Sequence, residues 1–478
     1  MKALNLQDKL LYGIGILGVL ALFFMTSTNP FFWDTIQFGS EHPSYFYSIN
    51  LNGFLLPSEI DSGHVPAFGW YIAAMWTIFG KSVLVSHLAL FPFVIGILWQ
   101  LIVLSKHYVT KTFSPLLFLA LLLEPTLLGQ ITLVSPDVCL VFFLLMALNS
   151  INKKKRIFLL ISILGLMITS NRGAMVAFCL FLYHVILLWI AHKGIVKTVL
   201  LKVFLHGLWY VPGAFIFIIY NSYHYIQTGW IGYHENMTWA ACFERVDFLG
   251  FLRNVAIYGW RLLDSGRLAV WVLLIFILFK YKLSILKLKG VSPLLILMLL
   301  FVLLLPLNML WAKNLMGPRY LLPIFIIVTL TTTVLFTVTS YNERFKKAVL
   351  SLICISLISG HFYIYPNKIS QGWDASLAYL PYFELKDKMV SYLKDENIDF
   401  EEVEAFFPSQ GKLGIYKLDN DNRFLDGYTG ASNYVIYSNI NNVSDIVLEN
   451  LEHDYVLVKE FKSNGIFYRL YERHKNNG

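Results

Sequence analysis

Four carboxylates and two histidines lie in one short stretch of the chain that contains neither lysine nor arginine. Residues 29–65 carry Asp34, Glu41, Glu59 and Asp61, and they end in the sequence Asp61-Ser62-Gly63-His64-Val65-Pro66. The net charge of the chain is +8, so acid without base is unusual over this length. Carboxylate and imidazole groups are frequent proton acceptors in active sites. We interpret this stretch as one wall of an active site.

Further charged residues interrupt apolar runs later in the chain. Asp137 follows Pro136 at an expected helix start, Arg172 lies in Ser170-Asn171-Arg172-Gly173, and Arg319 precedes Tyr320 in Pro318-Arg319-Tyr320. Each has a structural alternative to a catalytic role. Asp137 could cap its own helix, since a carboxylate there meets free N–H groups and a favourable dipole. Arg319 could reach lipid headgroups, and His64 could bond only to the backbone.

The elements that must position these residues are membrane helices. The chain is 57% hydrophobic and 14% charged, and its mean hydropathy is +0.60. Apolar runs approaching the ~20 residues that span a bilayer recur from Leu10 almost to Tyr365. The first run is followed by Thr-Ser-Thr-Asn-Pro and not by a small-residue cleavage site, so we expect a retained helix. The composition excludes a soluble fold.

Short basic clusters recur between these runs and predict the topology. Placing them on the cytoplasmic side gives eleven spans, with the N-terminus inside and the C-terminus outside. This holds only if Ala67 to Phe79 lies at the outer surface and does not cross. The expected spans are 10–28, 84–104, 113–133, 137–151, 157–170, 173–192, 198–220, 267–280, 292–311, 320–340 and 348–365. The basic residues thus report orientation, and we expect no nucleic-acid partner.

The same topology gathers the charged residues on one side. The acidic stretch, Asp137 and a predicted loop from about Asn221 to Arg267 all face outward, and so do Arg172 and Arg319. The positive-inside tendency predicts few Lys and Arg residues in an outer loop. The absence of Lys and Arg from the acidic stretch therefore indicates on which side of the membrane the stretch lies. The cations around Arg172 and in Lys313 to Tyr320 run against this tendency and need partners of negative charge.

From about Pro366 the composition changes to mixed charge, which predicts two domains: a transmembrane domain over 1–365 and an extracytoplasmic α/β domain over 366–478. We expect a helix over Phe383 to Glu396. The predicted strands are Val403 to Phe407, Tyr434 to Tyr437, Tyr455 to Phe461 and Gly465 to Tyr471, with a hairpin at Ser463-Asn464-Gly465. The four cysteines show no CxxC pair, so neither a disulfide framework nor a zinc site is predicted.

An ordered set of motifs resembles the GT-C membrane glycosyltransferases, specifically the group of protein O-mannosyltransferases and aminoarabinose transferases. The resemblance covers roughly residues 1 to 340. It rests on Trp33-Asp34, His64-Val65-Pro66, Trp76-Thr77-Ile78-Phe79-Gly80, Asp137 before a Leu/Phe-rich helix, and Pro318-Arg319-Tyr320-Leu321-Leu322-Pro323. It implies an α-helical polytopic fold with outer juxtamembrane helices.

The resemblance also implies a function. The enzyme would be an inverting glycosyltransferase that moves a sugar from a polyprenyl-phosphate donor to a hydroxyl of a glycan, lipid or protein. Asp34 would be the base and Asp137 a second acid of the site. The donor phosphate would be bound by Arg319, Arg172, His64 and Tyr320. A flippase or transporter of lipid-linked glycans and a noncatalytic assembly subunit are the alternatives.

The motifs depart from the family at Thr35, where many members carry a second acid after the first. An acidic pair that binds metal is therefore not supported, and ligand spacing does not favour a divalent ion held by Asp34, His64 and Asp137. We predict no cofactor and no stable metal. Glu124, on an apolar segment before Pro125, should face the protein interior or a helix end. The sugar and the acceptor are not determined, although the 221–267 loop offers Trp230, His234, Glu235, Trp239, Glu244, Arg245 and Asp247.

Overall fold

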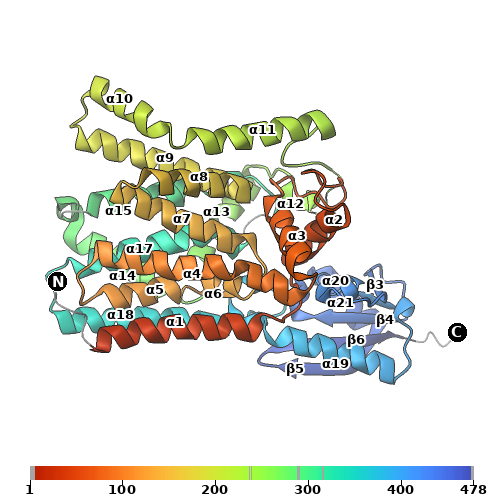
Figure 1. Cartoon of the computed structure of the whole chain (residues 1–478). Coiled ribbons are helices and arrows are strands. Elements are labelled where there is room, and N and C mark those ends of the chain that lie inside the picture. The colour runs from red at the N-terminus through yellow and green to blue at the C-terminus, as the bar shows by residue number, and fades with distance from the viewer. Residues whose placement is uncertain (1–5, 236, 238, 288–290, 315–316, 475–478) are drawn as a thin grey trace.

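The long helices run side by side as one bundle, and a small mixed sheet packs at one end of it (Figure 1). The computed structural model describes residues 6–235, 237, 239–287, 291–314 and 317–474. The N-terminus lies at the opposite end of the bundle from the sheet (Figure 1). The α-helical polytopic fold with a small C-terminal α/β domain is therefore confirmed.

The bundle helices are joined mostly by short turns. They are α1 (Leu6–Thr26), α4 (Val83–Tyr108), α5 (Ser114–Leu122), α6 (Pro125–Ile131), α7 (Pro136–Lys153), α8 (Arg156–Thr169), α9 (Asn171–Ala191), α10 (Val196–Gly207), α11 (Val211–Thr228), α13 (Phe248–Leu263), α14 (Leu268–Tyr281), α15 (Val291–Leu304), α17 (Leu322–Thr337) and α18 (Glu343–Ser359). Shorter helices at the end that carries the sheet are α2 (His42–Ser48), α3 (Ala67–Phe79), α12 (Ala240–Phe243) and α16 (Leu307–Leu310).

The predicted count of eleven spans is not confirmed. Within the described residues, 7 helices are long and apolar enough to cross a membrane, or up to 10 if each bent pair counts as one span. The bent pairs are α5–α6 at 63°, α10–α11 at 60° and α13–α14 at 96°. The α8 helix has 14 residues, about 21 Å at the α-helical rise, which is short for a ~30 Å hydrocarbon core.

The predicted outer loop over 221–267 is largely helical, and this corrects the sequence analysis. The α11 helix continues to Thr228, and α13 occupies most of the second half of the segment. The turn between α13 and α14 is possible because Ser265 and Gly266 adopt φ values of 53° and 78°. Residues 248–263 mix polar and apolar side chains, so they do not form the long apolar run by which the sequence analysis identified membrane helices.

The α3 helix does not run along the bundle. It lies beside α2 at the end that carries the C-terminal sheet, while α4 runs back toward the N-terminal end (Figure 1). The basic turns that join α7 to α8, α9 to α10 and α17 to α18 lie at that N-terminal end (Figure 1). The predicted alternation of basic loops and acid-rich loops between two ends of the bundle is therefore present in the fold.

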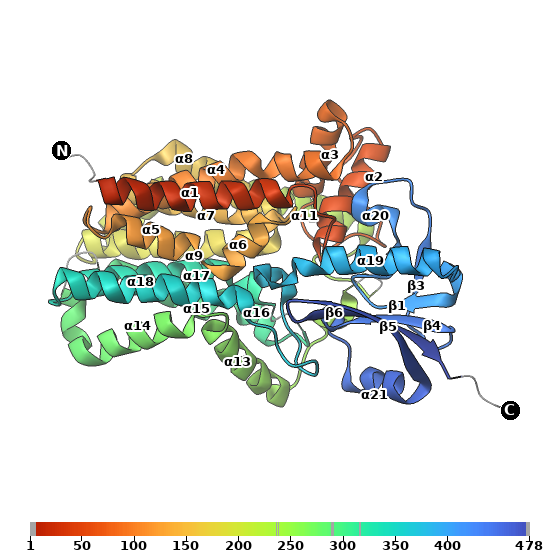
Figure 2. The same ribbon diagram turned by 90° about the horizontal axis from the view of Figure 1, so that it is seen from below.

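The C-terminal sheet has six strands in the order β2-β3-β1-β4-β6-β5. The strands are β1 (Val403–Ala405), β2 (Gly411–Lys412), β3 (Phe424–Gly427), β4 (Tyr434–Ser438), β5 (Tyr455–Ser463) and β6 (Ile466–Arg473). β1 pairs in parallel with β3 and β4, and the other pairs are antiparallel. The sheet lies between α19 (Pro381–Asp395) and α21 (Asp445–Asp454) (Figure 2).

All four predicted strands and the predicted helix are present in this domain, with ends shifted by a few residues. The hairpin between β5 and β6 turns at Asn464 and Gly465, which both have positive φ, as a two-residue type I′ turn requires. The short strands β2 and β3, and the helices α20 (Gly414–Lys417) and α21, were not predicted.

The acidic stretch lies between the bundle and the C-terminal domain. The Phe31 amide donates to the Tyr416 carbonyl at 2.9 Å, and the Ser40 hydroxyl donates to the Ile415 carbonyl at 2.7 Å. The fully buried ring of Phe32 stacks on Tyr379 with ring centroids 4.5 Å apart. The C-terminal domain therefore holds in place the loop that carries Asp34.

The segment after α18 also returns to the bundle. Gln130 of α6 donates its side-chain amide to the Asp374 carbonyl at 2.7 Å, and Thr126 donates to the Ala375 carbonyl at 3.2 Å. A Cβ added at Gly129 would lie 2.9 Å from the Ser376 nitrogen, so the two backbones approach closely. The domain boundary at residue 366 stays a prediction, but residues just beyond it contact the transmembrane helices.

Candidate functional site

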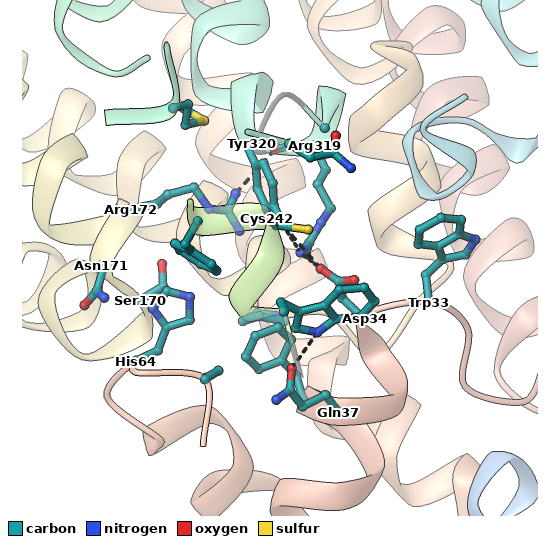
Figure 3. A pocket seen from close by; sticks show the side chains of 18 of the residues that line it. Trp33, Asp34, Gln37, His64, Ser170, Asn171, Arg172, Cys242, Arg319 and Tyr320 are labelled. Carbon is teal, nitrogen blue, oxygen red and sulfur yellow. Dashed lines mark hydrogen bonds and ion pairs between the residues drawn. The ribbon is translucent and has the colours of Figure 1, made fainter. Parts of the chain in front are cut away.

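Arg319 is the centre of a cluster of charged side chains. Its Nη1 donates to Asp137 Oδ2 at 3.1 Å, its Nε pairs with Asp374 Oδ2 at 3.1 Å, and its Nη2 pairs with Asp34. The Asp34 carboxylate and the Arg319 guanidinium point toward each other in Figure 3. Three carboxylates from distant parts of the chain therefore share one guanidinium.

Local structure fixes the position of each acid. Asp34 follows Trp33, whose backbone is left-handed with φ 51°, in the turn after α1. Asp137 lies in the first turn of α7, where the Ser135 hydroxyl caps the helix by accepting from the Asp137 amide at 3.2 Å. Asp374 lies in the 3-10 turn Trp373–Ala375.

Arg172 adds a second cation to the cluster. Its Nη1 lies 2.7 Å from Asp137 Oδ1, so Asp137 bridges both arginines. A Cβ at Gly173 would lie 1.9 Å from the Leu166 carbonyl oxygen, so only glycine allows the tight turn from α8 into α9 that carries Arg172. The guanidinium carbons of Arg172 and Arg319 each lie 4.6 Å from the centroid of the Tyr320 ring.

The cluster lines a cavity of about 810 Å³. Asp34, Asp374, Arg172, Arg319, Tyr320 and His64 all contribute to its lining, several of which Figure 3 labels. The Asp34 and Asp374 side chains are 16% and 12% exposed, whereas Asp137 is 2% exposed and lies behind the arginines. Asp34 and Asp374 can reach a ligand in the cavity, and Asp137 orients the arginines.

Other walls of the cavity come from regions that carry no family motif. Cys242, Asn308 and Phe407 line it from α12, α16 and the C-terminal domain. The Phe407 ring packs edge-on against Trp33 at 5.3 Å and against Trp239 at 5.0 Å between centroids. The C-terminal domain thus closes one side of the cavity beside Asp34.

His64 reaches the cavity through a tightly held loop. Asp61 accepts from the Gly63 amide at 2.8 Å and pairs with His224 Nε2 at 2.9 Å, while Asn171 donates to the Gly63 carbonyl at 3.0 Å. Gly63 has φ 67°, and a Cβ there would lie 2.6 Å from Gly232, so no other residue fits. The acidic stretch is thereby fixed to α9 and α11.

Among the groups of the cavity with shifted pKa values, His64 and Asp374 bear most directly on its chemistry. Burial, followed by the positive charge of Arg172, the neighbouring imidazole of His42 and the positive charge of Arg319, lowers the pKa of His64 to about 3, so its imidazole is neutral and can act as a hydrogen-bond donor but not as a cation. Burial raises the pKa of Asp374 to about 6, against the opposing effect of Arg319 and with the help of Asp34 and Asp137.

The structure gathers every residue that the sequence analysis selected: Asp34, Asp137, Arg172, Arg319, Tyr320 and His64. Their roles stay predictions. Asp374 was missed because it lies beyond the predicted domain boundary. One signal was available, since the dipeptide Trp-Asp of residues 33–34 recurs at 373–374.

Metal independence also stays a prediction. Over the part of the chain that the structure describes, no three His, Cys, Asp or Glu side chains are placed to share a metal ion. Asp34, Asp137 and Asp374 converge on Arg319, so the positive group at their centre is a guanidinium.

A second buried ion pair lies outside the cavity. Glu124 is fully buried, as expected for an acid in an apolar segment, and accepts from Arg267 Nε at 2.7 Å. Its second oxygen accepts from the Leu127 amide at 2.8 Å. Arg267 also donates to the Thr126 hydroxyl at 2.6 Å. This pair connects the bend of α5–α6 to the start of α14.

No protein-family model and no curated protein sequence matches the chain. Among solved structures, two of ArnT from Cupriavidus metallidurans, one bound to undecaprenyl phosphate and one in the apo state, are similar to it. Their TM-score is 0.51, their sequence identities are 9% and 10%, and each alignment covers 96% of this chain and 97% of the ArnT chain. The chain therefore has the fold of ArnT over almost its whole length, and the expected GT-C-like architecture of a multi-pass membrane protein is confirmed.

Proposed function

We propose that this chain is an inverting glycosyltransferase that moves a sugar from a polyprenyl-phosphate donor to an acceptor hydroxyl. The observation that carries the proposal is the cluster of Asp34, Asp137 and Asp374 around Arg319, with Arg172 beside it, on the wall of an 810 Å³ cavity. The ArnT fold supports it, since the ArnT crystal structure holds undecaprenyl phosphate.

Asp34 is suited to act as the base. It is the most exposed acid of the cluster and lines the cavity. It takes the proton of the acceptor hydroxyl while the acceptor oxygen bonds to the anomeric carbon. The bond from that carbon to the phosphate oxygen breaks, and its electron pair leaves with the polyprenyl phosphate. A single displacement inverts the anomeric centre, and a positioned base contributes about 10²- to 10⁴-fold in rate.

The two arginines are suited to hold the phosphate. Negative charge grows on the leaving phosphate, and guanidinium donors in a partly dry cavity stabilise it more strongly than water does. Tyr320 and the neutral His64 add hydrogen-bond donors at the same wall. Asp137, bonded to both guanidiniums, orients them.

The distribution of charge suggests on which side of the membrane the reaction occurs. Basic turns lie at the end of the bundle that carries the N-terminus, and the cavity lies at the other end (Figure 1). By the positive-inside tendency the N-terminus is cytoplasmic, and the cavity and the C-terminal domain are extracytoplasmic. The acceptor is then a glycan, lipid or protein outside the cytoplasmic face.

The test compares two acids of the same loop. A deletion strain is complemented with the wild type, with Asp34→Asn or with Glu59→Gln, and envelope glycans and glycoproteins are measured by mass spectrometry. Glu59 is exposed and is not part of the cavity wall. We expect Glu59→Gln to restore the missing sugar and Asp34→Asn to fail while inserting normally. Full restoration by Asp34→Asn would overturn the assignment in favour of a noncatalytic subunit.

A further inference from the structure

Every guanidinium nitrogen of Arg319 is already in contact with an acidic side chain. Its Nε pairs with Asp374 and its Nη1 with Asp137, each at 3.1 Å, and its Nη2 contacts Asp34 and, at 3.1 Å, the Tyr320 hydroxyl. A guanidinium has five N–H donors on three nitrogens. All three nitrogens of Arg319 already contact carboxylates.

The charge of the cluster leads to the same difficulty. Three aspartates surround two arginines, and the cluster is almost closed to solvent. A donor phosphodiester adds a further negative charge at the same wall. Like charges a few ångströms apart repel each other more strongly in a medium of low dielectric than in water, so one carboxylate has to withdraw or take up a proton when the phosphate binds.

Asp374 is the acid that can withdraw. Asp137 is held by both arginines in the first turn of α7. Asp34 contacts both Arg319 and the Tyr320 hydroxyl. Among the described residues, the side chain paired with the Asp374 carboxylate is Arg319 alone. The carbonyl of Asp374 stays fixed by Gln130, so its side chain can rotate while its main chain remains in place.

We infer that the Asp374 carboxylate occupies the position of the donor phosphate on the Nε edge of Arg319, and that phosphate binding displaces it. The inference rests on the proposed function and deepens it. Asp374 is then a positioning residue that sets the affinity for the lipid-linked donor. It keeps Arg319 aligned in the empty cavity and releases it to a phosphate.

Proton uptake follows from this exchange. The charged groups that face Asp374 are Arg319, Asp34 and Asp137. Burial raises the pKa of Asp374 to about 6, Asp34 and Asp137 add to this effect, and Arg319 opposes it. Below this pH the free enzyme already holds a neutral Asp374. Above it the displaced carboxylate takes up a proton, because its side chain is buried and stays close to Asp34, Asp137 and the incoming phosphate. Affinity should therefore fall about tenfold per pH unit above 6, because the competent fraction of the enzyme falls by that factor.

The test measures binding and requires no knowledge of the sugar. The probe is a radiolabelled short-chain polyprenyl methyl phosphodiester, whose single negative charge does not change between pH 5 and 8. Equilibrium dialysis against the purified full chain in detergent gives Kd at each pH. For Asp374→Asn we expect Kd to be about 30-fold lower than for the wild type at pH 7.5, the inverse of the ~3% protonated fraction, and similar to the wild type near pH 5.

The matched control is Asp264→Asn. Asp264 is a half-buried acid 3.5 Å from Arg261, another arginine of the cavity wall. The substitution removes the same charge as Asp374→Asn at a residue that does not pair with Arg319. We expect it to leave the wild-type pH profile in place. Equal tightening by Asp264→Asn would show a general charge effect and would overturn the inference.

The remaining outcomes separate the inference from the proposed function. A flat pH profile of the wild type, or equal Kd values for the wild type and Asp374→Asn at pH 7.5, overturns the role of Asp374 and leaves the glycosyltransferase proposal intact. No binding of the probe by either protein at any pH overturns both. The wild-type profile serves as the second measurement if Asp374→Asn does not fold.

Discussion

Two buried arginines of this protein have opposite surroundings. Arg267 is 3% exposed and faces one carboxylate, that of Glu124, together with the Thr126 hydroxyl and the face of the Phe325 ring, 3.7 Å from its guanidinium carbon. Arg319 is 6% exposed and faces three carboxylates on the wall of a cavity. The first arrangement balances its charge, and the second has an excess of acid.

This difference separates a structural ion pair from a candidate active site. Both oxygens of Glu124 are bonded within the protein, so nothing is left for a ligand. The Arg319 cluster holds three aspartates but two arginines, so negative charge exceeds positive charge, and the cluster lies at the wall of the cavity. Burial, with a smaller contribution from the like charges of Asp34 and Asp137, raises the pKa of Asp374, and such perturbed groups are concentrated at functional sites.

The largest expected effect concerns the balanced pair. Glu124→Gln leaves the buried Arg267 without its counter-charge, which should lower the free energy of unfolding by about 3 to 5 kcal/mol. Asp374→Asn leaves Arg319 with two carboxylates and should cost much less. Thermal unfolding of both variants in detergent, followed by intrinsic fluorescence, measures the contrast. Equal losses for the two variants would remove the distinction between the two arginines.

A smaller effect is expected on catalysis from the acid behind the cluster. Asp137→Asn keeps the shape of the side chain but weakens the bridge between Arg172 and Arg319. Misplacement of the two cations by a fraction of an ångström to an ångström should lower the transfer rate by up to about 100-fold. Donor turnover in proteoliposomes, split into kcat and KM, reports it. An unchanged kcat would show that Asp137 only stabilises the fold.

The loss of folding stability at low pH should depend on His64. Its pKa of about 3 in the folded chain lies below the ordinary value of 6.5, so the unfolded chain binds the proton more readily. Stability is therefore lost as pH falls from 6.5 toward 3. His64→Gln should flatten this loss, as unfolding temperatures at pH 7 and pH 4.5 can show. If His64→Gln shifts the unfolding temperatures at pH 7 and pH 4.5 by the same amount, groups other than His64 cause the loss of stability at low pH.

The smallest effect is expected for an exposed pair near the cavity. Lys313 and Glu244 are 2.7 Å apart, and their side chains are 57% and 53% exposed. Glu244→Gln should change the free energy of unfolding by no more than about 1 kcal/mol, and 1 M salt should remove the difference. If Glu244→Gln instead lowers the free energy of unfolding by several kcal/mol and 1 M salt does not remove this loss, exposure to water does not explain why the exposed and buried ion pairs differ.

The sequence predicted the gathering of the site through two independent signals. Hydropathy and basic turns placed Asp34, Asp137, Arg172 and Arg319 at one end of the bundle, where the structure has them in direct contact. The cations that run against the positive-inside tendency were expected to need negative partners. Arg172, Arg319 and Lys313 each have carboxylate partners within the protein.

Other features were beyond sequence reasoning for physical reasons. Hydropathy averages over a window, so it cannot report a bend such as the 96° angle between α13 and α14. It also ends the membrane domain where apolar composition ends, so Asp374 was assigned to the other domain. Its proximity to Arg319 depends on the backbone of 372–376 packing against Gly129 and Gln130, contacts between residues more than 240 positions apart.

The sequence by itself determined that the chain is a multi-pass membrane protein with a C-terminal α/β domain, and which end of the bundle carries the acid-rich loop. These follow from composition and periodicity, which are local properties. Only the tertiary structure decided that a third aspartate, Asp374, joins Asp34 and Asp137 on Arg319, because long-range packing alone sets which charges meet. The ratio of three acids to one arginine, on which the proposed competition with a donor phosphate rests, is a property of that packing.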